Sequence, residues 1–206
     1  MIFGFFKKAK KIKGLIAYFN LSDWWQLELS ESDRSRIMEK YQPMGSGSSA
    51  LVDGNISSTS QTSIGLLLGM VGWFAKEEDR HIAYKLFEKA EGLIDLNSHV
   101  LDIHFLYGEK VAISYKDRTR VLDGLEKAIK ACEQQIFFSK KSAGALLKKY
   151  EGSPLPSHRG FLQLAIIREK QKEFEKAIIL CKQALSDGWS GDWEKRIVRC
   201  NRKMNL

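Results

Sequence analysis

The sequence predicts an all-α fold of stacked antiparallel helical hairpins, preceded by an N-terminal helical extension. Only three prolines occur in 206 residues, which leaves long stretches free to form helices. Apolar residues in these stretches recur every three or four positions, the spacing of one helical face. One such face, built largely from small residues, occurs three times. A chain of this length buries roughly 70% of the surface exposed by its unfolded form, so a single core needs no disulfide or metal.

The first helix is predicted in the N-terminal region, residues 1–42. Its apolar residues are spaced by three and four, and five lysines cover most of the remaining circumference. We favour a helix that packs on the protein with a solvated lysine face, because any surface helix is amphipathic. The alternative is a helix that lies on an anionic membrane surface or docks on a partner. The apolar set is Phe5, Ala9, Ile12, Ile16 and Phe19, and the basic set is Lys7, Lys8, Lys10, Lys11 and Lys13.

A second helix is predicted later in the same region. Ser30 stands three residues before Asp33, which resembles a capping box with Asp in place of Glu. Upstream of it, Trp24 and Trp25 point about 100° apart if they are helical, so both can be buried only between two partners. We therefore expect this segment to pack between neighbours rather than to expose an aromatic anchor.

Residues 43–63 change abruptly to Gly, Ser and Thr, and this composition predicts a flexible linker or an irregular loop. The stretch "GSGSS" is not a P-loop, because no G-x-x-x-x-G-K-[ST] follows it. The predicted organisation is therefore 1–42 for the N-terminal helices, 43–63 for the linker or loop, and 64–206 for a helical array with a C-terminal capping helix.

The array is predicted from the small-residue face that recurs in residues 64–206. Alanine or glycine at these positions lets two helix axes approach closely while a larger neighbour fills the adjoining hole. Each copy follows another helical stretch after a short break, so we expect three helical hairpins, which must stack to bury their apolar faces. The three copies are Ala83, Phe87 and Ala90; Gly124, Ala128 and Ala131; and Ala177, Cys181 and Ala184.

The last hairpin resembles a tetratricopeptide repeat. Equivalent small positions at 83, 124 and 177 are separated by 41 and 53 residues, where the family repeats every 34. Residues 139–158 are the obvious insertion. The resemblance implies a right-handed superhelix of hairpins in the array. The residues that carry it are Phe161, Leu164, Ala165, Ala177, Cys181 and Ala184.

The resemblance also implies a function. Such arrays are non-enzymatic interaction scaffolds that bind an extended peptide or a partner protein in a groove formed by the first helix of each hairpin. The chain lacks the Lys and Asn arrangement with which one variant of the family binds a peptide carboxylate. Carried over by position, the partner-binding groove would contain Leu68, Lys76, Glu109, Ile113, Lys116, Asp117, Arg159, Leu162, Ile166, Glu169 and Lys170.

The net charge of +8 comes from the ends of the chain. Residues 1–20 contain five lysines and no acid, residues 190–206 contain five basic and two acidic side chains, and residues 21–189 sum to zero. Nucleic acid is therefore not an expected partner of the array. The alternative function is a peripheral membrane or nucleic-acid-associated protein that acts through its basic termini. A homo-oligomer is a further possibility, because the Phe-rich start is a candidate self-association surface.

No pattern of catalytic residues occurs, so we expect no enzyme, no cofactor and no metal. His99, Asp102 and His104 are the densest group of possible metal ligands. On a helix, however, His104 is offset by about 140° from His99, so the three side chains do not converge. We interpret them as polar residues near a helix start.

Cysteine usage and hydropathy indicate the compartment. Cys132, Cys181 and Cys200 are odd in number and widely separated, which favours a reduced cytoplasm. The longest apolar stretch, "IGLLLGMVGWFA", has 12 residues where a membrane span needs about 20. We therefore predict a cytoplasmic protein. The alternative is peripheral association with a membrane through the lysine-rich N-terminus.

Overall fold

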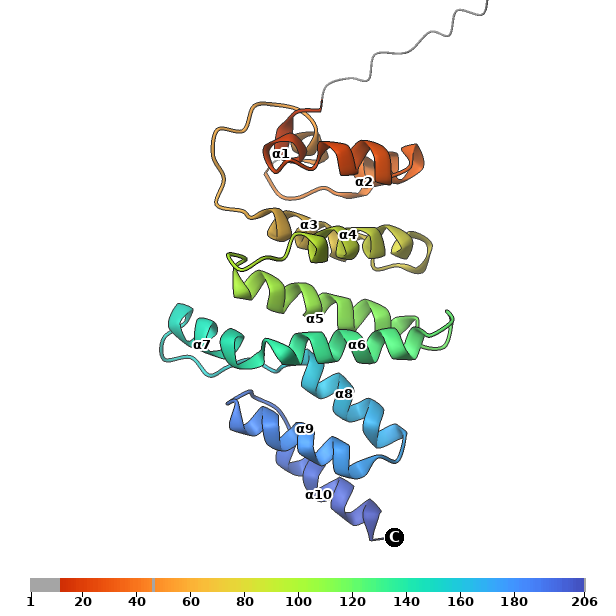
Figure 1. Cartoon of the computed structure of the whole chain (residues 1–206), viewed down its shortest axis with the longest axis vertical. Coiled ribbons are helices and arrows are strands. Elements are labelled where there is room, and N and C mark those ends of the chain that lie inside the picture. Colours follow the sequence, from red (N-terminus) through yellow and green to blue (C-terminus); the bar gives the residue numbers. More distant parts are fainter. Residues whose placement is uncertain (1–11, 46, 206) are drawn as a thin grey trace, which may run out of the picture. The chain divides into compact units, whose positions relative to one another are not determined.

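The computed structural model describes residues 12–45 and 47–205, which form an all-α structure (Figure 1). About 69% of the chain is helical, and the described residues contain no β-strand. The predicted all-α class is therefore confirmed. Two compact units, Met1–Leu66 and Leu67–Leu206, make up the chain. The predicted boundaries at 42 and 63 stay predictions.

The first unit is built from short elements. They are α1 (Gly14–Tyr18), a π-helical segment (Trp24–Glu28), α2 (Glu31–Lys40) and a 3-10 helix (Ser48–Leu51). Helix α3 (Ser63–Val71) begins in this unit and ends in the second.

Within the described residues the N-terminal helix begins at Gly14, so Ile12 and Lys13, which were predicted to be helical, precede it. Gly14 has a φ of 60°, and a Cβ there would lie 2.5 Å from the carbonyl oxygen of Ala50. The 3-10 helix therefore packs against the start of α1, and its Leu51 is fully buried. Residues 47–55 thus form a loop packed on this unit. The predicted positions Phe5, Lys7, Lys8, Ala9, Lys10 and Lys11 lie in 1–11, outside the described residues.

The second predicted helix start is confirmed. The Ser30 hydroxyl accepts a hydrogen bond from the backbone N–H of Asp33 at 3.1 Å, and the Asp33 carboxylate accepts one from the N–H of Ser30 at 3.0 Å. Trp24 and Trp25 are both buried, as predicted. Arg34 of α2 donates hydrogen bonds to backbone carbonyls of the π-helical segment and of the turn that follows it. These bonds satisfy carbonyl groups that a helix end leaves without partners.

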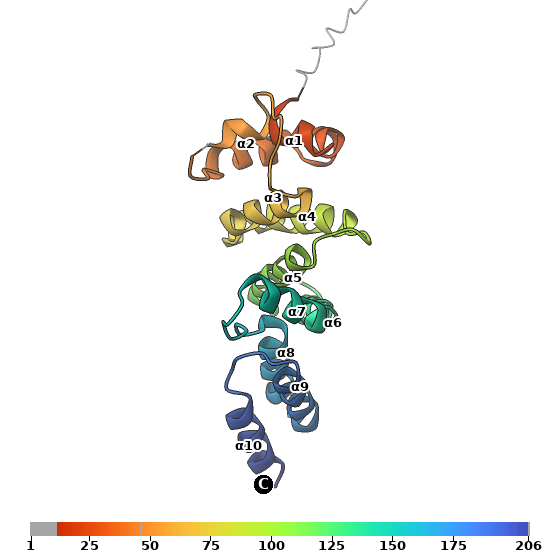
Figure 2. The same cartoon turned by 90° about the vertical axis from the view of Figure 1, so that its left-hand side faces the viewer.

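The second unit is built from packed helix pairs (Figures 1 and 2). Helix α5 packs on α6, α8 on α9, and α9 on α10, while α6 and α5 both contact α8. Pairs of antiparallel helices thus follow one another in layers within this unit. The helices are α4 (Arg80–Gly92), α5 (Val100–Lys116), α6 (Gly124–Phe137), α7 (Ser139–Lys149), α8 (Arg159–Lys170), α9 (Phe174–Ser186) and α10 (Trp193–Met204).

All three copies of the small-residue face are buried, as the spacing predicts. The closest approach is at Gly124, where a Cβ would lie 2.3 Å from the carbonyl oxygen of Asp117. The turn between α5 and α6 is therefore folded back onto the first residue of α6. Only a glycine allows this approach without a backbone shift.

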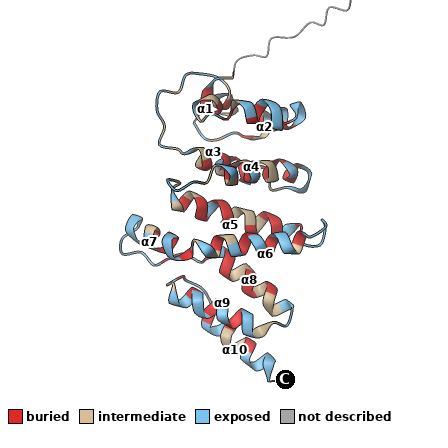
Figure 3. Ribbon diagram, viewed as in Figure 1, coloured by how far each residue is buried: buried red, intermediate tan, exposed pale blue. Residues whose placement is uncertain are grey.

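The predicted insertion contains α7 and an extended segment after it. Gly152 has a φ of 76°, which favours glycine where the chain leaves α7. The segment is held by Ser190, whose N–H donates to the carbonyl of Pro156 at 3.2 Å. Figure 3 shows that α5 is largely buried, whereas α10 buries only a stripe of its surface. Helix α5 is thus central to this unit and α10 lies at its end.

We predict opposite effects for two glycine substitutions in this unit. Gly124→Ala should lower the free energy of unfolding by about 1–3 kcal/mol, because the methyl group collides with backbone. Gly144→Ala should raise it by about 0.5–1 kcal/mol, because Gly144 is exposed on α7 with open space around it. Thermal unfolding followed by circular dichroism measures both. Equal shifts in the same direction would contradict the packing at Gly124.

Candidate functional site

The exposed edges of α5 and α8 meet at two points. Arg159 Nη1 donates to Glu109 Oε1 at 2.9 Å and to the carbonyl oxygen of Gly108 at 3.1 Å. Near the other end of α8, Lys170 Nζ donates to the phenol oxygen of Tyr115 at 3.2 Å. We call the area formed by Glu109, Tyr115, Arg159 and Lys170 the α5–α8 surface. Three of these four residues were predicted groove residues.

Tyr115 is the member of this surface that sequence reasoning missed, because its spacing assigned it to a packing position. Its ring is half-buried, with the Arg118 guanidinium 4.3 Å and Lys170 Nζ 5.8 Å from the ring centroid. The predicted residue Lys116 is exposed beside it, and the half-buried Ile166 lies on the same helical face as Lys170. The surface therefore combines an aromatic ring, an aliphatic side chain and an excess of positive charge.

Four other predicted site residues do not belong to the α5–α8 surface. Leu68 is half-buried on α3, and Lys76 is exposed before α4. Leu162 is half-buried and packs on the core cluster around Phe161. In the first unit, Lys13 is exposed at the N-cap of α1. The structure describes no hydrogen bond or ion pair that links these residues to the α5–α8 surface.

Two predicted groove residues are buried and a third, Glu169, is largely covered, so these three do not line an exposed groove as predicted. Ile113 is 1% exposed and Asp117 is 6% exposed. The Glu169 side chain is 11% exposed. The prediction placed them by their position in a repeat, but Asp117 and Glu169 pair with side chains of other helices and Ile113 is enclosed in the core. They hold the unit together instead of presenting a binding surface.

Asp117 joins the end of α5 to α4. Its carboxylate forms an ion pair with Arg80 and accepts a hydrogen bond of 2.7 Å from the Tyr84 phenol. Burial, followed by the hydrogen bond to Asp117, raises the pKa of Tyr84. The phenol therefore stays protonated and acts as a donor to Asp117. The arrangement is a buried, internally satisfied pair, which is the form in which buried charge is tolerated.

Glu169 joins α8 to α10. Its carboxylate accepts hydrogen bonds from Arg196 at 2.9 Å, Arg199 at 2.8 Å and Lys203 at 2.9 Å. The hydrogen bond from Arg199 is the largest cause that lowers the pKa of Glu169 to about 2. Arg196 is itself buried, so not every basic residue of α10 is solvated. Glu169 is thus the anchor of the terminal helix.

The two buried histidines of the second unit belong to one aromatic cluster. The His104 ring stacks on Trp189 with centroids 5.3 Å apart and planes 2° apart, and His158 meets the same indole edge-on at 4.7 Å. His158 also caps α8, because its Nδ1 accepts a hydrogen bond from the N–H of Phe161 at 3.2 Å. Burial lowers the pKa of His104 to about 4 and that of His158 to about 3. Both imidazoles are therefore neutral at pH 7.

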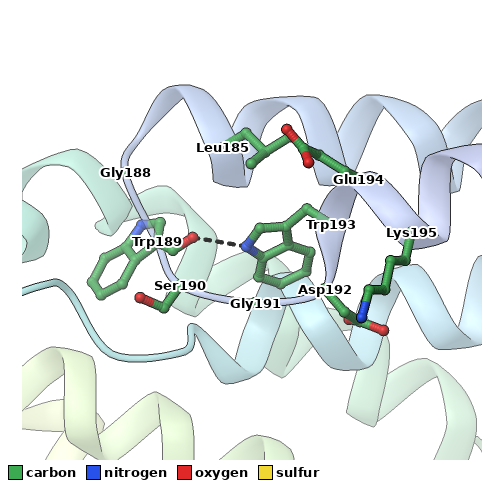
Figure 4. Close-up of a pocket in the computed structure, with 9 residues that line it drawn as sticks. All are labelled: Leu185, Gly188, Trp189, Ser190, Gly191, Asp192, Trp193, Glu194 and Lys195. Carbon is green, nitrogen blue, oxygen red and sulfur yellow. Dashed lines mark hydrogen bonds between the residues drawn. The ribbon is translucent and has the colours of Figure 1, made fainter.

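The hollow at the start of α10, about 560 Å³, is shown in Figure 4. The Trp193 indole donates a hydrogen bond of 2.8 Å to the carbonyl of Trp189, which fixes the loop that forms its wall. Asp192, Glu194 and Lys195 line it, and all three are exposed. Because its charged side chains are solvated instead of converging in a buried pocket, the hollow offers no preformed site for a small molecule.

The described residues hold neither a cluster of metal ligands nor a membrane-spanning helix. Within residues 12–45 and 47–205, no group of three or more His, Cys, Asp and Glu side chains is arranged to hold a metal ion. His99 is the N-cap of α5, whereas His104 faces Trp189, so the two imidazoles have different surroundings. No helix in these residues is both long enough and apolar enough to cross a bilayer.

We predict that Glu169→Gln destabilises the second unit by on the order of 3 kcal/mol. The amide removes the negative charge and leaves the buried Arg196 with only the 3.9 Å ion pair to the half-exposed Asp192. Urea unfolding at pH 7 measures the effect. Glu173→Gln is the matched control, because Glu173 pairs with Arg168 and Lys176 at the surface and should have little effect. A loss for Glu173→Gln as large as that for Glu169→Gln would contradict the anchoring role.

We also predict that acid weakens the second unit between pH 6.5 and about 4. The two imidazoles have pKa values of about 4 and 3 in the folded chain and 6.5 when unfolded, so the unfolded chain binds more protons in this range. One pKa unit corresponds to about 1.4 kcal/mol, so lowering the pH from 6.5 to 5 should cost on the order of 2 kcal/mol for each histidine. Urea unfolding at the two pH values measures this loss.

The control for the acid effect is the exposed His99. His104→Gln should reduce the pH dependence by about half, because one buried imidazole no longer titrates. His99→Gln is the matched substitution outside the cluster, at the exposed start of α5, and it keeps both buried imidazoles. A pH dependence that is the same in both variants would show that other groups cause it.

Comparisons with known proteins leave the function to be inferred from this chain alone. No protein-family model, curated protein or solved structure matches it. The α5–α8 surface, the buried ion pairs and the histidine–tryptophan cluster are therefore the observations on which a function can rest.

Proposed function

We propose that this chain is a non-enzymatic interaction protein that binds a protein or peptide partner on the α5–α8 surface. The observation that carries the proposal is the pairing of α5 with α8 through Arg159 and Lys170. These two contacts place the first helices of two successive hairpins side by side, with Tyr115 between two cations. Arg and Tyr are the residue types that dominate binding energy in protein interfaces.

The surface suits a partner that carries carboxylates. Lys116, Arg118, Arg159 and Lys170 are exposed on or beside the α5–α8 surface, and Glu109, which pairs with Arg159, is the one acidic member of that surface. Exposed ion pairs such as Arg159–Glu109 contribute roughly 0–1 kcal/mol, so a partner's carboxylate can replace Glu109 at little cost. Such pairs also fix where a partner docks, because charge complementarity gives specificity and speeds association.

The tetratricopeptide-like superhelix is part of the same proposal. Three buried small-residue faces support it, as do the helix pairs α5–α6 and α8–α9 and the contact between α5 and α8. The insertion of α7 and its extended segment between the second and third hairpins accounts for the long spacing between them. We also propose a cytoplasmic location, supported by three free and buried cysteines.

The alternative function rests on the basic termini. At the C-terminal end, three of the five basic side chains of α10 contact Glu169, so their charge is partly neutralised within the fold. At the N-terminal end, four of the five lysines lie outside the described residues. Binding to anionic vesicles or DNA that falls steeply with salt would favour this alternative.

The proposed function is tested by affinity capture with the full chain from its native cell lysate. A partner that binds the α5–α8 surface should be lost with the double variant Arg159→Glu and Lys170→Glu, which reverses two of its cations. The double variant Lys130→Glu and Lys182→Glu is the matched control, because it makes the same charge change at exposed positions on α6 and α9. Quantitative mass spectrometry of the retained proteins is the measurement.

Two outcomes would contradict the proposal. Retention of the same proteins by both double variants would show that the α5–α8 surface is not used. Loss of all partners when Lys7, Lys8, Lys10, Lys11 and Lys13 are changed to Gln, with no effect of Arg159→Glu and Lys170→Glu, would move the function to the N-terminus.

A further inference from the structure

An apolar pocket lies between α5, α7 and the extended segment after α7. We call it the α7 pocket, and its volume is about 270 Å³. Phe105 of α5, Leu146 of α7 and Tyr150 at the end of α7 line it, together with Pro154 and Leu155. Small-molecule sites usually have volumes of roughly 300–1,000 Å³. The α7 pocket is therefore of a size that suits one or two large side chains of a peptide.

The floor of the α7 pocket is fixed by the core. Leu146 and Leu155 are 4% and 5% exposed and belong to the cluster that contains Phe161 and Trp189. Ser190 holds the extended wall, since its N–H donates to the carbonyl of Pro156 and its hydroxyl donates to that of Leu155. Because the residues of the floor are already held in place, few side chains have to be ordered when a ligand binds. This lowers the entropy cost of binding and favours affinity.

The rim of the α7 pocket is aromatic and exposed. Phe105 is 46% exposed and Tyr150 is 53% exposed, on opposite helices. Exposed aromatic side chains over a buried aliphatic floor are the arrangement of an anchor site, where one bulky side chain of a partner becomes fully desolvated. The fold therefore leaves about half of each of these side chains uncovered.

The charge around the α7 pocket indicates the charge of its partner. Helix α7 carries four lysines and no acidic residue, and Lys149 Nζ lies 5.6 Å from the centroid of the Tyr150 ring. Within the described residues, none of the four lysines forms an ion pair, and Glu151 is the acidic residue that directly follows Tyr150. Helix α7 therefore attracts acidic chains. The lysines are Lys140, Lys141, Lys148 and Lys149.

We propose that the α7 pocket binds a bulky apolar side chain from an acidic peptide segment of a partner protein. The aromatic rim and aliphatic floor take the apolar side chain, and the lysines of α7 contact the flanking carboxylates. A second copy of this chain is the less suitable occupant, because each copy carries a net charge of +8. The site is separate from the α5–α8 surface and does not depend on the function proposed there.

Fluorescence polarisation with the full chain tests this proposal. The probe is a labelled nine-residue peptide of Asp and Glu around one central Trp, and a second probe has Ala in place of Trp. Binding of the Trp probe should be at least tenfold tighter than that of the Ala probe. Phe105→Ala should weaken binding of the Trp probe about fivefold or more, because half of the aromatic rim is lost. The melting temperature of this variant shows whether it folds.

The charge requirement is tested with Lys148→Glu and Lys149→Glu in one variant. This variant should bind the Trp probe at least tenfold more weakly, whereas Lys130→Glu with Lys182→Glu should stay within about twofold of the unchanged chain. Arg159→Glu with Lys170→Glu should also stay within about twofold, which separates this site from the α5–α8 surface.

Three results would overturn the proposal. Equal binding of the Trp and Ala probes would show that the pocket is not used. Equal weakening by the two lysine double variants would show general attraction to a basic chain. A dimer in sedimentation velocity that Phe105→Ala dissociates would make a second copy the occupant.

Discussion

The contact of one indole with two neutral imidazoles is the interaction on which the second unit depends. Trp189 follows α9, His104 lies within α5, and His158 caps the start of α8. The indole N–H donates to the Ser139 hydroxyl at 2.7 Å, and this hydroxyl donates to Asp187 at 2.6 Å. Three helices and the loop after α9 therefore converge on a single side chain. Each ring contact adds about 0.5–1.5 kcal/mol beyond the area that it buries.

This cluster determines where both proposed binding sites lie. Because His158 begins α8 against α5, the next residue, Arg159, is placed beside Glu109 at one end of the α5–α8 surface. Gln135 strengthens the same junction from α6, since its amide donates to the carbonyl of His104 and accepts from the N–H of Gly160. The residue after Trp189 is Ser190, which holds the wall of the α7 pocket. Disturbing the cluster should therefore alter two surfaces that share no residue.

The helices could be predicted from the sequence, whereas the side chains that join them could not. Helical spacing, the Ser30 capping box and the small residues at Ala83, Gly124 and Ala177 are local patterns, and each appears where it was predicted. The ion pairs of Asp117 with Arg80 and of Glu169 with α10 join residues far apart in the sequence. A repeat pattern gives the position of a residue along its helix but not the side chain that it contacts on a neighbouring helix. The pattern therefore assigned Asp117 and Glu169 to an exposed groove. The same limit hid Tyr115, which the pattern assigned to the core.

Net charge describes a binding surface only after internal pairing is taken into account. The sequence locates the positive charge at the two ends, yet on α10 the carboxylate of Glu169 holds three of the five basic side chains. Helix α7 lies in the part of the chain whose charges sum to zero, but its four lysines form no ion pair within the described residues. A partner meets the charges that the fold leaves unpaired. For an acidic partner, α7 is therefore a stronger attractor in the second unit than the terminal helix, although the terminal helix contains more basic residues.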